Sequence, residues 1–359
     1  MIPAIIISIA FPLGYLYIVR QLDLYASGSF KTVLICFLWG FAAFFLAIPI
    51  NRAFLAIGGL TIVITRVAPI IEEILKSSIL VYYVRRPNFT YFVDGAIFGF
   101  AAGTGFTVME NLLYLSKADS SMGLAVALTR VFSTSLLHGS TTALVGVSLG
   151  RLRFGRGYSR IISLVVGLAA AMTMHLTFNN IITANQNTSG FFIAALIGFG
   201  GLGLNALFIT LGLREERQWI RETLKMDVGV SATESNVVQQ MGDLDTLLAP
   251  IKNRFGDEKR KQVETFLRLE AQIGLKRKTE EMTPDPHLRD ELNTEIIELR
   301  KKLDVLRREV GVYCMSYVRS ILPPSTEPIW TRLSQSMGAQ ETTATGSLWN
   351  TLGGKMGGR

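Results

Sequence analysis

The first 213 residues consist of long apolar runs separated by short polar loops. A helix needs roughly 20 mostly apolar residues to cross the hydrocarbon core of a bilayer. Seven stretches approach this length, at residues 2–19, 32–50, 58–84, 92–114, 122–150, 159–184 and 190–213. The fourth carries Gly95, Gly99, Gly103 and Gly105, which suit close helix packing in lipid. The pattern predicts an all-α fold, a polytopic membrane helix bundle of about seven transmembrane helices.

Basic residues gather in alternate loops between these runs. Arg20 and Lys31 follow the first run, and Arg85 and Arg86 follow the third. Arg151, Arg153, Arg156 and Arg160 follow the fifth run. Arg214, Arg217 and Arg221 follow the seventh. The intervening loops carry Arg52, then Lys117 offset by Asp119, then no charge. Because basic loops stay in the cytoplasm, this alternation predicts a multi-pass protein of the cell membrane with its N-terminus outside and its C-terminus cytoplasmic.

The composition changes near residue 214. The 359-residue chain is 49% hydrophobic, with a mean hydropathy of +0.35, which argues against an ordinary soluble domain. Residues 1–213 hold 13 Lys and Arg against 6 Asp and Glu, whereas residues 214–359 hold 23 against 22. The basic excess lies in short loops, so it does not predict binding to nucleic acid. Cys36 and Cys314 form no disulfide or metal-binding pattern.

The charged second part has its own organisation. We predict a transmembrane domain over 1–213, a linker over 214–250, helices over 251–322 and a disordered tail over 323–359. Apolar residues recur at spacings of four and three at Leu292, Ile296, Leu299, Leu303, Leu306 and Val310. This periodicity is typical of a coiled-coil seam. A cytoplasmic helical hairpin and a self-associating or partner-binding coiled coil both fit it.

Ionisable residues are concentrated inside the apolar runs, where they are costly and become functional candidates. The chain has only three histidines, and two of them lie within runs. The candidate catalytic residues are Glu72, Glu73, Glu110, His138, His175 and Asn179. If the helices that carry these residues converge, they form a carboxylate and imidazole pocket inside the bilayer.

Such a pocket can hydrolyse a peptide bond in two ways. A glutamate can act as the general base on water while histidines stabilise the oxyanion or protonate the leaving amine. Alternatively, Glu73, His138 and His175 can bind zinc and leave one position open for the water. Glu72 and Lys76 are four residues apart and can pair on one helix face, which favours Glu73 as the base. Both mechanisms stay open, with zinc slightly favoured because a cation offsets the glutamate charge.

The order of these residues resembles that of a known family. Glu72-Glu73-x-x-Lys76, Phe106-x-x-x-Glu110-Asn111, His138 and His175-x-x-x-Asn179 follow one another on successive runs, as do the motifs of the PrsW intramembrane proteases. These are relatives of the CAAX prenyl protease and bacteriocin-processing (CPBP) superfamily. Prenyl proteases usually carry histidine in place of Glu110 and arginine in place of Lys76, which argues against a prenylated substrate.

The resemblance covers about residues 60–185 and implies an intramembrane protease domain. Its substrate would be a membrane-anchored protein in the lipid bilayer, for example an anti-sigma-factor-like regulator. By the same motifs, the paired glutamates, Glu110 and the two histidines would form the active site. Two other functions fit a buried carboxylate and histidine cluster: a transporter or channel with a proton relay, and a non-catalytic signalling scaffold.

Overall fold

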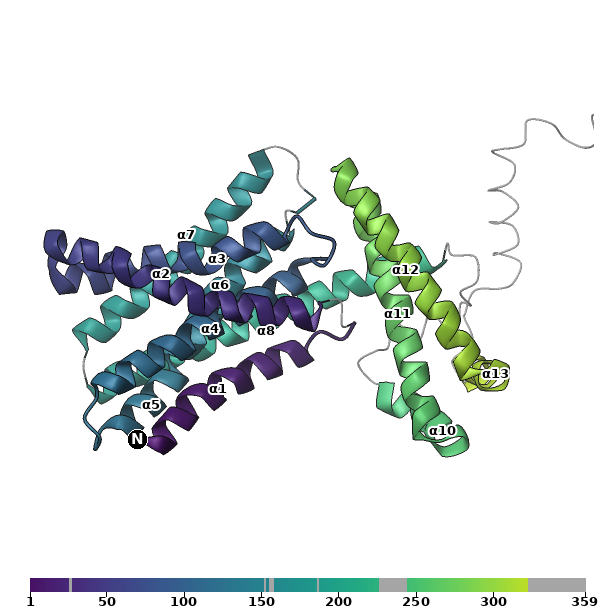
Figure 1. The fold of residues 1–359 in the computed structure, drawn as a ribbon, viewed down its shortest axis with the longest axis horizontal. Coiled ribbons are helices and arrows are strands. Elements are labelled where there is room, and N and C mark those ends of the chain that lie inside the picture. Colours follow the sequence, from purple (N-terminus) through teal and green to yellow (C-terminus); the bar gives the residue numbers. More distant parts are fainter. Residues whose placement is uncertain (26–27, 152, 155–157, 186, 226–243, 322–359) are drawn as a thin grey trace, which may run out of the picture.

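The computed structural model describes residues 1–25, 28–151, 153–154, 158–185, 187–225 and 244–321, and these residues form helices without strands (Figure 1). The predicted disordered tail, 323–359, lies outside the described residues. The helices are α1 (Ile2–Gln21), α2 (Phe30–Ile62), the π-helix η1 (Val63–Val67), α3 (Ala68–Tyr83), α4 (Phe92–Lys117), α5 (Gly123–Phe132), α6 (Thr134–Arg151), α7 (Tyr158–Ala184), α8 (Thr188–Lys225), α10 (Leu244–Phe255), α11 (Asp257–Met282), α12 (Pro286–Val310) and α13 (Val312–Ile321).

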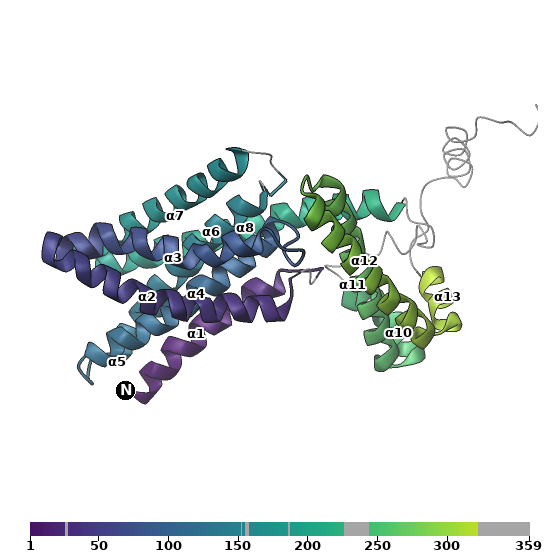
Figure 2. The same ribbon diagram turned by 45° about the horizontal axis from the view of Figure 1, so that its top comes forward.

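The apolar helices form a polytopic membrane bundle, as the sequence predicted. Within the described residues, five helical segments are long and apolar enough to cross a membrane. One of them, Phe30–Tyr83, has 54 residues, far more than a single crossing needs. Its backbone leaves the helical conformation at Gly59, where φ is 71° and ψ is 171°. A positive φ suits glycine, and beyond it η1 and α3 return alongside α2 (Figure 2).

The fifth apolar run does not form the single helix that its length suggested. The backbone breaks at Ser133, where φ is −128° and ψ is −79°, and this separates the 10-residue α5 from the 18-residue α6. The prediction of one continuous helix over 122–150 was therefore wrong. The break places the start of α6, and His138 with it, beside α4.

Helix α4 is the central element of the bundle. Of its most apolar stretch, 94% is buried, and the helix packs against α1, α2 and α6. A side chain added at Gly95, Gly99 or Gly103 would collide with the backbone of α6, and one at Gly105 would collide with α2. The predicted close packing through these glycines is confirmed. The contact of Gly103 with the His138 carbonyl fixes that histidine next to α4.

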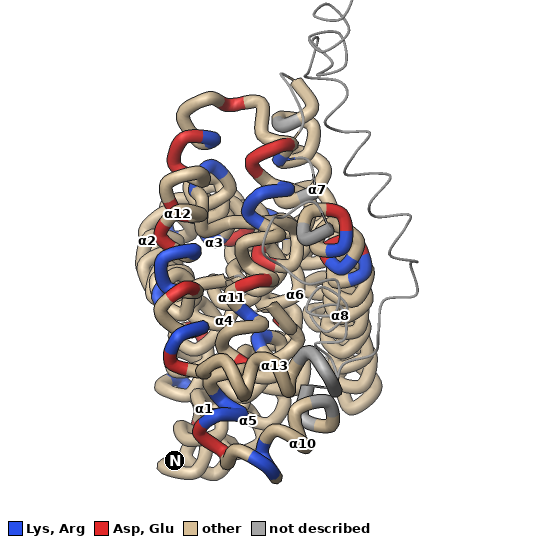
Figure 3. The backbone as a smooth tube through the Cα atoms, turned by 90° about the vertical axis from the view of Figure 1, so that its right-hand side faces the viewer, with Lys and Arg blue, Asp and Glu red and all other residues tan. Residues whose placement is uncertain are grey.

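The C-terminal helices pack on one end of this bundle. Helix α8 continues past the predicted domain boundary at 213 and ends at Lys225. Helices α11 and α12 are joined by three residues and pack together as a hairpin, with Leu292, Ile296, Leu303 and Val310 buried. Figure 3, seen from the side of these helices, shows Lys and Arg interspersed with Asp and Glu along them.

Hydrogen bonds join this hairpin to the basic loops of the bundle. Arg268 Nη1 donates to the Leu24 carbonyl at 2.7 Å, and Lys276 Nζ donates to the Pro87 carbonyl at 3.0 Å. Arg153 Nη2 donates to the Arg86 carbonyl at 3.1 Å, which joins the third and fifth loops. The loops predicted to share one side of the membrane therefore lie together. We call this side, marked by Arg85, Arg86 and Arg153, the basic end.

Which side of the membrane the basic end occupies is a prediction from its charge. In a Cys36→Ala/Cys314→Ala background, a membrane-impermeant thiol reagent applied to intact cells should label Ser120→Cys. It should not label Asn88→Cys, which is exposed at the basic end. Labelling in the opposite pattern would reverse the orientation.

Candidate functional site

Four helices bring five of the six candidate residues into one cluster. Glu72 and Glu73 come from α3, Glu110 from α4, His138 from α6 and His175 from α7. Helix α3 begins directly after η1, and π-helical turns are frequent at functional sites. The convergence expected from the sequence is therefore present in the structure.

Glu73 is the most tightly held carboxylate of the cluster. Its side chain is fully buried, and its Oε1 lies 2.7 Å from Lys76 Nζ and 2.8 Å from His175 Nδ1. Thr141 donates to the same oxygen at 2.9 Å. The sequence suggested that Lys76 would pair with Glu72, but Lys76 pairs with Glu73 instead. The reason given for Glu73 as the base therefore no longer holds.

His138 lies between a cation and a carboxylate. Its Nδ1 is 2.8 Å from Lys76 Nζ, and its Nε2 is 2.9 Å from Glu110 Oε2. An ammonium group can only donate, so Nδ1 accepts from Lys76 and Nε2–H donates to Glu110. The His138 ring meets the His175 ring edge to face, with centroids 4.8 Å apart.

Arg130 of α5 holds the remaining side of Glu110. Its Nη2 lies 2.7 Å from Glu110 Oε2, and its Nε donates to Asn111 Oδ1 at 2.8 Å. Asn111 in turn donates to Ser135 Oγ at 3.0 Å, at the start of α6. Arg130 thus pairs with a glutamate of the cluster, and it joins α5 to α4.

Glu72 differs from the other two glutamates in its surroundings. Its Oε2 lies 3.9 Å from His175 Nε2, the one ion-pair contact found for it among the described residues. Its side chain is 12% exposed and that of Glu110 is 17% exposed, whereas Glu73 is fully enclosed. Glu72 therefore combines a weakly engaged carboxylate with access from outside the cluster.

One metal-binding geometry exists within the described residues. Ligand atoms of Glu72, His138 and His175 lie within 4.8 Å of one another. Glu73, which the sequence placed in this set, instead binds His175 Nδ1, and a carboxylate in that position orients a metal-ligating histidine. His175 and Glu72 therefore fit a metal directly. His138 would have to give up one of its present partners to bind the metal, because Lys76 contacts one ring nitrogen and Glu110 the other.

Asn179 does not join the cluster. Its Nδ2 donates to the Ile64 carbonyl of η1 at 2.9 Å, so it ties α7 to the π-helical turn before Glu72. Conversely, sequence reasoning missed Thr141 and Thr142, whose hydroxyls lie 2.9 and 3.5 Å from Glu73 oxygens. Their spacing of three and four residues from His138 puts them on the same helix face, which is a signal that the sequence does contain.

Comparisons with known proteins identify one related family. Residues 28–204 match the model of a family described as PrsW family intramembrane metalloprotease. Protease PrsW of Bacillus subtilis (strain 168) is 27% identical over 135 residues, which are 37% of this chain and 60% of that protein. The chain thus spans less than two thirds of this curated relative. No solved structure matches it.

Proposed function

Through residues 28–204 this chain belongs to the PrsW family, and we propose that it hydrolyses a peptide bond in a membrane-anchored protein. The observation that carries the proposal is the cluster of Glu72, His138 and His175, with Glu73 orienting His175. Carboxylates and imidazoles at these separations can activate water and donate a proton to a leaving amine. As the resemblance implies, we propose a membrane-anchored regulator, such as an anti-sigma-factor-like protein, as the substrate.

We assign the activation of water to Glu72. Lys76, His175 and Thr141 occupy Glu73 Oε1, while Arg130 and His138 occupy Glu110 Oε2. The Glu72 carboxylate, by contrast, is partly exposed and makes only one distant contact, so a water molecule can reach it. A water molecule beside it would also lie near the two imidazole rings. His138, whose Nε2 carries a proton in this arrangement, can donate to a developing oxyanion or a leaving nitrogen.

The same residues support a metal-dependent form of this chemistry. A divalent cation held by Glu72, His138 and His175 would act as a Lewis acid and lower the pKa of bound water. Glu110, which is 17% exposed and contacts His138, would then be the candidate base for that water. Glu72 is essential in both forms. The two forms differ in whether the purified protein contains a metal.

The depth of the cluster predicts where the substrate is cut. His138 precedes the last residue of α6, Arg151 at the basic end, by 13 positions. At 1.5 Å per residue this is about 20 Å, in a hydrocarbon core about 30 Å thick. We therefore expect cleavage in the half of the membrane away from the basic end. Proteomics of membrane-protein fragments should find new ends at that depth.

The control for this experiment uses the third histidine. Cells with His175→Gln should lose the fragments, whereas cells with His287→Gln should keep them, because His287 is 85% exposed on α12. Fragments that persist in His175→Gln cells, or that disappear equally in both variants, would contradict the proposed function.

Elemental analysis tests the metal. We expect about one zinc or similar ion per chain in the wild type and in His287→Gln, and none in His175→Gln, because three ligands of this type bind such metals tightly. A chelator should abolish cleavage, and adding the metal back should restore it. Metal-free protein that still cleaves would leave the mechanism with glutamate and histidine alone.

A further inference from the structure

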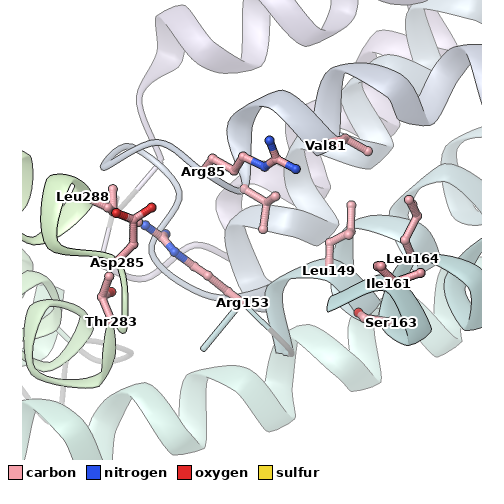
Figure 4. A pocket seen from close by; sticks show the side chains of 11 residues that line it. Val81, Arg85, Leu149, Arg153, Ile161, Ser163, Leu164, Thr283, Asp285 and Leu288 are labelled. Carbon is pink, nitrogen blue, oxygen red and sulfur yellow. The ribbon is translucent and has the colours of Figure 1, made fainter. Parts of the chain in front are cut away.

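A cavity lies at the basic end, away from the candidate site. It has a volume of about 120 Å³ and lies between the ends of α3, α6 and α7 and the turn that joins α11 to α12 (Figure 4). Leu149 on its wall follows His138 by 11 residues on α6, which is about 16 Å. None of the residues that line this cavity belongs to the cluster of glutamates and histidines.

The two sides of the cavity differ in chemistry. The ends of the membrane helices supply an apolar wall that includes Val81, Leu149 and Leu164. The lining also includes the charged residues Arg85, Arg153 and Asp285, and Figure 4 shows Arg153 and Asp285 near one another. An apolar wall beside guanidinium groups matches a molecule with a hydrocarbon part and an anionic part.

The apolar wall continues into a surface that faces lipid. Ile161, which lines the cavity, is 60% exposed, and Ile162, Val165 and Val166 on the same stretch of α7 are 57–58% exposed. In a helix bundle that crosses a membrane, an exposed apolar face of this kind contacts acyl chains. The cavity therefore lies beside the bilayer, at the level where basic residues meet the headgroups.

Arg85 supplies a charge that the protein itself does not engage. Among the described residues, no hydrogen bond or ion pair is found for its guanidinium, and the residue is exposed. Arg153, by contrast, donates to the Arg86 carbonyl and lies over the Phe89 ring. The nearby carboxylate of Asp285 caps α12 by accepting from His287 N–H, and the helix N-terminus offsets its negative charge.

We propose that this cavity binds an anionic glycerophospholipid. One acyl chain would lie along Val81, Leu149 and Leu164, and the phosphate would pair with Arg85, since a guanidinium binds phosphate oxygens in a planar, bidentate manner. The lipid would also contact Thr283, Asp285 and Leu288 of the hairpin. It would thereby join the C-terminal hairpin to the membrane bundle. This proposal is independent of the proteolytic function.

The test measures lipid binding to the purified full-length protein by native mass spectrometry, with phosphatidylglycerol and phosphatidylcholine of equal chain length. We expect phosphatidylglycerol to bind the wild type at least tenfold more tightly. Arg85→Gln should remove this preference. Arg86→Gln loses the same charge one residue away, where Arg86 lies over the Tyr82 ring, and it should keep the preference.

A second variant tests the apolar wall of the cavity. Val81→Phe keeps every charge and narrows the cavity, so it should weaken phosphatidylglycerol binding about as much as Arg85→Gln does. Equal loss in Arg85→Gln and Arg86→Gln would mean that charge at the basic end attracts lipid without a defined site, and would overturn the proposal. Competition by soluble glycerol phosphate at the same concentration as the lipid would show a phosphate site without an acyl chain, and would overturn it too.

Discussion

Glu72→Gln is expected to slow peptide-bond cleavage by a factor of about 10² to 10⁴, the usual contribution of a general base. The amide keeps the size of the carboxylate but neither accepts a proton from water nor binds a metal as an anion. Because Glu72 makes only a distant contact with His175, at 3.9 Å, the substitution should leave the fold intact. The measurement is the initial rate of fragment formation by purified protein, beside its thermal unfolding temperature.

A matched variant tests whether the loss of rate is specific to Glu72. Asn180→Asp adds a carboxylate on α7 close to η1, outside the cluster, where Asn180 donates to the Thr65 carbonyl. It should leave the rate within a few-fold of the wild type. If Glu72→Gln cleaves at the wild-type rate, the assignment of Glu72 fails in both the metal-dependent and the metal-free form.

The helical bundle could be predicted from the sequence because lipid imposes a simple rule. Every crossing needs a long apolar run, and each loop records its side of the membrane by its charge. The runs and the clustering of basic loops at one end both appear in the structure. The break at Ser133 could not be predicted, since apolar composition says nothing about where a helix backbone is interrupted.

The sequence brought forward five residues that the structure places in one cluster, but it could not predict how they pair. Lys76 is within reach of both Glu72 and Glu73, because residues three and four apart are neighbours on a helix. All three lie on α3, and a second helix decides between the two pairings: Thr141 and His138 of α6 lie where Lys76 and Glu73 meet. Such a choice depends on how helices pack. The pairing of α11 with α12 could not be predicted either. The apolar positions of α12 fit a self-associating coiled coil as well as they fit a hairpin.

The buried pair of Glu73 and Lys76 should have the largest effect on stability. Both side chains are fully buried, and their charged atoms are 2.7 Å apart. Glu73→Gln would leave the Lys76 ammonium without its counter-charge in a medium of low dielectric constant. Removing one partner of a buried pair typically costs about 3–5 kcal/mol. We expect Glu73→Gln to lower the free energy of unfolding, measured by titration with a denaturing detergent, by an amount in this range.

The double variant Glu73→Gln/Lys76→Met separates stability from activity. Methionine fills a volume similar to that of lysine without a charge, so the double variant should recover most of the stability that Glu73→Gln loses. It should remain inactive, because His175 Nδ1 has lost the carboxylate that orients it, and His138 Nδ1 has lost its donor. A double variant as unstable as Glu73→Gln would show that Glu73 stabilises the bundle through Thr141 and His175 instead of through Lys76. A double variant that cleaves at the wild-type rate would remove Glu73 and Lys76 from the functional site.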